Sequence, residues 1–167
     1  MGVKKENIIY ILEGADGSGK STLAGQIAKH LDGNVLHQTF KKEWDMEEYA
    51  QDVITAAWLL SDYQTVILDR WVPSEYIYSK VFRGGEPYDT EGLIDYWDDT
   101  LNIIWIYCKT DRAIENHARK DQEGLEMFHD NVKVIEEYDK YIKNSKLPWI
   151  TYDYEKQDIK EFLREIT

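Results

Sequence analysis

Eight residues near the amino terminus have the types and spacing of a phosphate-binding loop. Residues 14–21 read GADGSGKS and fit the pattern G-x-x-x-x-G-K-[ST] without a mismatch. An apolar run at 8–12 precedes them and a helical pattern at 21–28 follows, which is the context in which this short motif binds phosphate. Glycines let successive backbone N–H groups turn inward, and the helix amino end adds partial positive charge. We expect this loop to bind a nucleoside triphosphate.

Two side chains of the loop carry most of its expected chemistry. Lys20 should reach the β- and γ-phosphates, and the Ser21 hydroxyl should ligate Mg²⁺. The predicted cofactors are therefore ATP and Mg²⁺. The predicted phosphate-binding residues are Gly14, Asp16, Gly17, Ser18, Gly19, Lys20, Ser21 and Thr22.

A second pair of charged residues follows the short apolar run at 64–68. Asp69 and Arg70 come directly after it. A phosphate-loop enzyme holds Mg²⁺, directly or through water, with a carboxylate at the end of a buried strand. Arginine offers a bidentate fork to phosphate. Taken alone, Asp69 could equally cap a turn, but beside the phosphate loop we favour the metal role, with Ser21 as the second predicted metal ligand.

The order of predicted elements indicates the fold that positions these residues. Short strands are expected near 7–12, 35–39, 64–68, 102–108 and 149–152, separated by helical patterns. Nearly continuous apolar strands that alternate with helices predict an α/β fold in three layers, with a five-stranded parallel sheet flanked by helices on both faces. Ligands of such folds bind at the carboxyl ends of the strands. The segments 14–21, 39–44, 69–70 and the region of Thr110 should therefore meet at one site.

Composition narrows the classes of partner. Lys and Arg total 20 against 32 Asp and Glu, which gives a net charge of −12 and argues against a general nucleic-acid binder. A small anionic ligand in a local basic pocket is compatible with that charge. No run approaches the length of a membrane span, no signal peptide is recognisable, and the single cysteine, Cys108, lies in an apolar run. We expect one domain over residues 1–167, in the cytoplasm.

Residues 12–22 (LEGADGSGKST) and 68–71 (LDRW) resemble the thymidylate kinases, within the P-loop nucleotide and deoxynucleoside kinases. That family reads E-G-x-D-G-x-G-K-S-T and later D-R-aromatic, and its element order covers nearly the whole chain. The resemblance implies transfer of the γ-phosphate of ATP to dTMP, with Asp16 at the deoxyribose 3′-hydroxyl and Arg70 at the acceptor phosphate. It also implies a short lid near 111–126, in which Arg119 stabilises the transferring phosphoryl group. The candidate catalytic residues are Lys20, Asp69, Arg70 and Arg119.

The segment after the second predicted strand departs from that family. Thymidylate kinases usually have R-E-P-G-G-T there, whereas residues 37–44 read HQTFKKEW. Glu43, Trp44 and the stretch 74–79 are similar to deoxynucleoside kinases, in which a carboxylate takes the proton of a 5′-hydroxyl and an aromatic ring packs on the base. A hydroxyl acceptor needs such a base, whereas a phosphate acceptor needs cations. Glu43 is thus a base only if the acceptor is a nucleoside, and otherwise a solvated loop residue.

Several functions and partners remain open from the sequence. The predicted acceptor-binding residues are Asp16, Phe40, Lys41, Glu43, Trp44, Arg70, Trp71, Tyr76 and Arg83. A kinase of a modified base or of a nucleic-acid hydroxyl is disfavoured by the charge. A P-loop regulatory ATPase would not need Asp16 and Arg70 in one crevice. The apolar stretch 56–60 belongs either to the core or to a dimer surface, and we expect a homodimer without a membrane partner.

Overall fold

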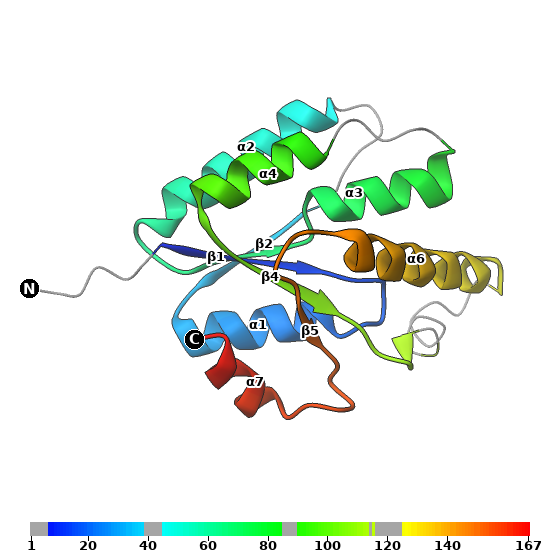
Figure 1. Cartoon of the computed structure of the whole chain (residues 1–167). Helices are drawn as coiled ribbons and strands as arrows, with labels where there is room; N and C mark the ends of the chain where they lie inside the picture. The colour runs from blue at the N-terminus through cyan, green and yellow to red at the C-terminus, as the bar shows by residue number, and fades with distance from the viewer. Residues whose placement is uncertain (1–6, 39–44, 85–89, 114, 116–124) are drawn as a thin grey trace, which may run out of the picture.

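The fold is built on a five-stranded parallel sheet (Figure 1). The computed structural model describes residues 7–38, 45–84, 90–113, 115 and 125–167, with only the backbone described for 125–130. The strand order is β2-β3-β1-β4-β5. The strands are β1 (Ile8–Glu13), β2 (Asn34–His37), β3 (Val66–Asp69), β4 (Asn102–Cys108) and β5 (Ile150–Tyr152).

Helices cover both faces of the sheet, which completes the three predicted layers (Figure 1). On one face lie α1 (Lys20–Leu31) and α7 (Ile159–Glu165). On the other lie α2 (Met46–Ser61), α3 (Val72–Tyr78), α4 (Glu91–Thr100) and α6 (Leu125–Asn144). Alternate residues of β1 supply the two cores, since Ile9 and Ile11 pack toward α2 while Tyr10 and Leu12 pack toward α1. The predicted α/β fold is confirmed.

Local sequence explains where the helices begin. The Asp45 carboxylate accepts the N–H groups of Glu47 and Glu48, each at 3.1 Å, so α2 begins as its sequence predicts. Pro73 occupies the first turn of α3, where its missing N–H costs nothing. Directly after α3, residues Ser79–Arg83 form a π-helical segment, η1.

The apolar stretch at 56–60 has some side chains in the core and others on the surface. Ala57 is fully buried against the sheet, whereas Trp58 and Leu59 are 43% and 56% exposed. The homodimer therefore stays a prediction. None of the described helices has both the length and the apolar character that crossing a membrane requires.

Candidate functional site

The loop between β1 and α1 is shaped by close backbone approach. A Cβ on Gly14 would overlap the carbonyl oxygen of Cys108 and lie 2.9 Å from Ser18 Oγ, so only glycine fits there. Gly19 has φ of 82°, and a Cβ on it would lie 2.9 Å from the ring of Tyr154. Ser18 Oγ is buried and makes no hydrogen bond within the described residues. The loop is thus tightly packed ahead of α1.

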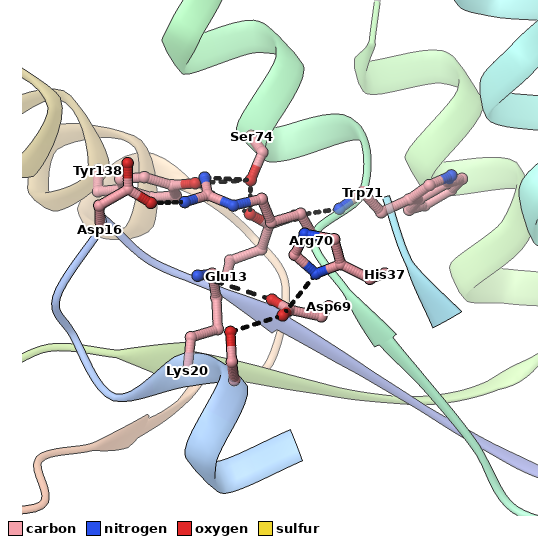
Figure 2. A network of polar contacts seen from close by, with 10 residues as sticks. Glu13, Asp16, Lys20, His37, Asp69, Arg70, Trp71, Ser74 and Tyr138 are labelled. Atoms are coloured by element: carbon pink, nitrogen blue, oxygen red, sulfur yellow. Dashed lines mark hydrogen bonds and ion pairs between the residues drawn. The ribbon is translucent and has the colours of Figure 1, made fainter. Parts of the chain in front are cut away.

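Lys20, Ser21 and Asp69 meet where β1 and β3 end (Figure 2). Lys20 Nζ lies 3.6 Å from Asp69 Oδ1, and the Ser21 hydroxyl donates to Asp69 Oδ2 at 2.9 Å. His37, at the end of β2, places Nδ1 2.9 Å from the same Oδ2. The register explains the meeting, because Asp69 pairs with Leu12 of β1 and with His37 of β2. The structure therefore brings together the two predicted metal ligands and the loop lysine.

Charge pairing sets the ionisation of this cluster. Burial opposes ionisation of Asp69, but Lys20 and hydrogen bonds from His37 and Ser21 hold the pKa of its carboxyl below the usual range. Burial and the nearby Arg70 lower the pKa of Lys20, while Asp69 counteracts them. Because the Lys20 ammonium is shielded from water, its attraction for a phosphate is stronger than it would be in bulk solvent.

The donor set fits a magnesium ion held together with nucleotide phosphates. Among the described residues, no group of three or more His, Cys, Asp or Glu could hold a metal by itself. Mg²⁺ does not need such a cage, because it keeps several waters and takes one or two carboxylates plus substrate phosphates. Asp69 Oδ1 is buried without a hydrogen bond within the described residues, and Ser21 Oγ lies 2.9 Å from Oδ2 of the same carboxylate. Ser21 and Asp69 are therefore the residues that would hold the ion.

Arg70 lies on the other side of the loop, facing Asp16 (Figure 2). Its Nη2 contacts Asp16 Oδ1 at 2.5 Å, its Nη1 lies 3.5 Å from Ser74 Oγ, and its guanidinium lies 4.7 Å from the Tyr78 ring centre. The backbone of Arg70 has φ of 77°, which side-chain-bearing residues rarely adopt. The Arg70 side chain contacts Asp16 within the loop, whereas the Asp69 side chain contacts Lys20 and Ser21 at its end. The predicted juxtaposition of Asp16 and Arg70 is present.

The environment of Arg70 keeps it charged. Burial alone would lower the pKa of the guanidinium, but the neighbouring tyrosine hydroxyls and the carboxylates of Asp16 and Glu13 raise it. The Asp16 side chain is 49% exposed, against 13% for Arg70. The Asp16 carboxylate faces solvent and can accept a hydrogen bond from a hydroxyl group. The more buried Arg70 guanidinium can at the same time contact an anion.

Two predicted acceptor residues lie elsewhere than expected. Trp71 is fully buried and donates its indole N–H to the Ala50 carbonyl at 3.0 Å, so the prediction that its ring packs against an acceptor is wrong. The positive φ at Arg70 sends the next side chain into the core. Tyr76 packs on Tyr141, with ring centres 5.5 Å apart, and lines a cavity of about 320 Å³ between α3, α4 and α6 that no residue of the loop lines.

Arg83 is paired with the buried carboxylate of Glu75 at 2.5 Å, and a role at the acceptor stays a prediction. Five other predicted residues or segments lie outside the described residues. They are Phe40, Lys41, Glu43, Trp44 and Arg119, the last together with residues 114 and 116–124 of the predicted lid.

Sequence reasoning missed Glu13 and its partners. This carboxylate at the end of β1 accepts hydrogen bonds from the Trp71 N–H at 2.8 Å, from the Ser74 hydroxyl and from the Tyr138 hydroxyl at 3.1 Å. Tyr138 lies on α6, 125 residues away. Two signals were available: Glu13 matches the first residue of the pattern E-G-x-D-G-x-G-K-S-T, and it is the sole charged residue of an otherwise apolar strand.

Comparisons with known proteins support the fold. No family model matches the sequence. No curated protein matches it either. Among solved structures, the YorR protein of Bacillus subtilis in complex with phosphorylated GDP is 24% identical, with a TM-score of 0.74 over 95% of this chain and 92% of that one.

Two further structures share the architecture. Deoxyadenosine kinase from M. mycoides, with the products dCMP and dCDP bound, is 20% identical with a TM-score of 0.58 over 95% and 96% of the two chains. Polyphosphate kinase 2 from Arthrobacter aurescens TC1 is 14% identical with a TM-score of 0.68 over 98% and 66%. At these identities the likeness shows the fold alone, an α/β arrangement with a five-stranded parallel sheet.

Proposed function

We propose that this protein is an ATP- and Mg²⁺-dependent kinase that phosphorylates a deoxynucleotide in the manner of thymidylate kinase. The observation that carries the proposal is the Arg70–Asp16 pair, set beside the Lys20–Asp69–Ser21 cluster across one loop. A protein that only hydrolyses a triphosphate needs the Lys20–Asp69–Ser21 cluster but does not need the Arg70–Asp16 pair. A kinase needs both, because it must hold an acceptor in line with the γ-phosphate.

Each group has a task in that reaction. The loop N–H groups and Lys20 bind the triphosphate, and Lys20 neutralises charge on the group in transfer. Mg²⁺, held by Ser21 and Asp69, supplies further charge neutralisation when it is bound. Arg70 faces the acceptor and the transferring phosphoryl group, while Asp16 accepts a hydrogen bond from a sugar hydroxyl. Preorganised charge of this kind is the main source of rate in phosphoryl transfer.

A deoxynucleoside acceptor is the second candidate, and one observation favours it. Within the described part of the site, Arg70 is the one cation beside Asp16, and it is already paired with that carboxylate at 2.5 Å. A hydroxyl acceptor demands less positive charge than a monophosphate. The deoxyadenosine kinase of similar fold adds support to this reading.

The test measures ADP release with ATP and Mg²⁺ against a panel of deoxynucleosides and their monophosphates, with product masses determined. We expect release that depends on one acceptor class, and its loss in Lys20→Met, which removes the loop cation. ADP release that no acceptor stimulates would overturn the kinase proposal in favour of an ATPase. The product mass separates the two acceptor classes.

A further inference from the structure

Glu13 is a buried carboxylate that no expected substrate group reaches. It is fully buried at the end of β1, directly before Gly14. Burying a charge is costly unless hydrogen bonds satisfy it. Here the Trp71 N–H, the Ser74 hydroxyl and the Tyr138 hydroxyl all point to its two oxygens (Figure 2). One carboxylate thus ties β1 to α3 and to α6.

The same residue helps to fix the turn that carries Arg70. The Arg70 N–H donates to the Leu12 carbonyl at 3.0 Å, and the next N–H, of Trp71, donates to Glu13 Oε1 at 2.8 Å. Two consecutive amides are therefore held by two consecutive residues of β1. Such bonds are needed because Arg70 has φ of 77°, a strained conformation that persists only where its surroundings impose it.

A second path runs through the side chain of Ser74. Its hydroxyl donates to Glu13 Oε2, lies 2.7 Å from the Tyr138 hydroxyl and lies 3.5 Å from Arg70 Nη1. Glu13 therefore acts on Arg70 both through the backbone and through the serine that its guanidinium contacts.

We propose that Glu13 is a positioning residue, which holds the Arg70 guanidinium against Asp16 through the Trp71 amide and the Ser74 hydroxyl, with Tyr138 anchoring this network to α6. This inference deepens the proposed function and rests on it for its kinetic readout. Burial raises the pKa of Glu13, while hydrogen bonds from Ser74 and Trp71 and the charge of Arg70 oppose that rise. All three hydrogen-bonding neighbours can donate, which suits an ionised carboxylate.

The kinetic test combines Glu13→Gln with Arg70→Lys. Loss of a charge-assisted buried hydrogen bond should lower kcat/KM for the acceptor about 10- to 100-fold. The KM for ATP should change by less than about twofold, because Lys20 and the loop N–H groups are untouched. In the Arg70→Lys background, Glu13→Gln should have little further effect, since a residue that acts through Arg70 has lost its target. Equal losses toward ATP and acceptor, or additive effects, would overturn the proposal.

A second measurement needs no turnover. Amide hydrogen exchange at residues 70 and 71 should accelerate in Glu13→Gln and in Tyr138→Phe. The matched control is Tyr141→Phe, one turn along α6, whose ring packs on Tyr76 and whose hydroxyl makes no hydrogen bond to Glu13 or Ser74 within the described residues. Unchanged exchange in Tyr138→Phe, or equal acceleration in the control, would refute the role. If the native protein phosphorylates no acceptor, the proposed function fails, and the exchange result alone decides on Glu13.

Discussion

Replacement of Gly14 by alanine tests the loop geometry most directly. The added Cβ would overlap the Cys108 carbonyl oxygen and lie 2.9 Å from Ser18 Oγ, and the backbone φ is 149°. A side-chain-bearing residue in such a conformation costs about 1–3 kcal/mol. Overpacking against β4 costs about 1–3 kcal/mol more. Because each kcal/mol lowers Tm by about 2–4 °C in a domain of this size, we expect a drop of about 4–24 °C.

Gly25→Ala is the matched control, because it makes the same chemical change where there is room. Gly25 lies on an exposed face of α1, and a Cβ there would meet nothing within 4 Å. Alanine inside a helix is favoured over glycine by about 0.5–1 kcal/mol, so the Tm of this variant should rise slightly. Scanning calorimetry of both variants gives the comparison.

The two variants, Gly14→Ala and Gly25→Ala, should also differ in their affinity for ATP. In Gly14→Ala the loop must shift away from Cys108 and displace Ser18, so its ATP affinity by titration calorimetry should fall, while Gly25→Ala should bind ATP as the native protein does. A Tm for Gly14→Ala within about 2 °C of the native value, with native ATP affinity, would refute the close approach on which this reasoning depends.

Three further predictions concern charge. Arg70→Lys should lower acceptor-dependent kcat/KM roughly 100-fold, because lysine lacks the bidentate fork; steady-state kinetics with native-like turnover would contradict this. Hydrogen bonds from Lys140 and Lys80 lower the pKa of Glu137. That group therefore stabilises the fold above the ordinary glutamate pKa of about 4.3 and loses its contribution as the pH falls through the lowered value. Urea unfolding should accordingly find Glu137→Gln less stable at pH 7, by about 1 kcal/mol at most, and equal to the native protein in strong acid, whereas a constant difference at all pH values would contradict the pairing. Burial raises the pKa of Cys108 to about 12, so iodoacetamide at pH 8 should leave the folded protein unmodified and alkylate it only in denaturant, with labelling of the native protein as the contrary outcome.

The architecture was predictable because its signals are local and repeated. Most strands are short apolar runs, each is followed by a helical pattern, and capping residues such as Asp45 stand where helices begin. The glycines of the loop at 14–19 indicate its conformation from the sequence alone, because other residues rarely adopt positive φ. By contrast, the π-helical segment Ser79–Arg83 leaves no signature, because its residues suit an α-helix equally well.

The site was predictable as a set of segments but not in the direction of each side chain. Trp71 follows Arg70 and was expected beside it, yet the positive φ at Arg70 turns the indole into the core. That angle depends on hydrogen bonds that the Arg70 and Trp71 N–H groups donate to Leu12 and Glu13, far away in the sequence. The contact between Glu13 and Tyr138 spans 125 residues, and no periodic pattern reports such a pairing.

The tripeptide Asp69–Arg70–Trp71 directs three successive side chains to three destinations: the Lys20–Ser21 cluster, Asp16, and the core beside Ala50. Insertion of one residue after Asp69 would move the Arg70 guanidinium to the buried position of Trp71, and deletion of Arg70 would put the indole opposite Asp16. Nearby surface connections can change length, because loops tolerate insertions where their backbone is exposed. The turn at Asp69–Trp71 cannot change length, so its length is specified as tightly as the identity of its residues.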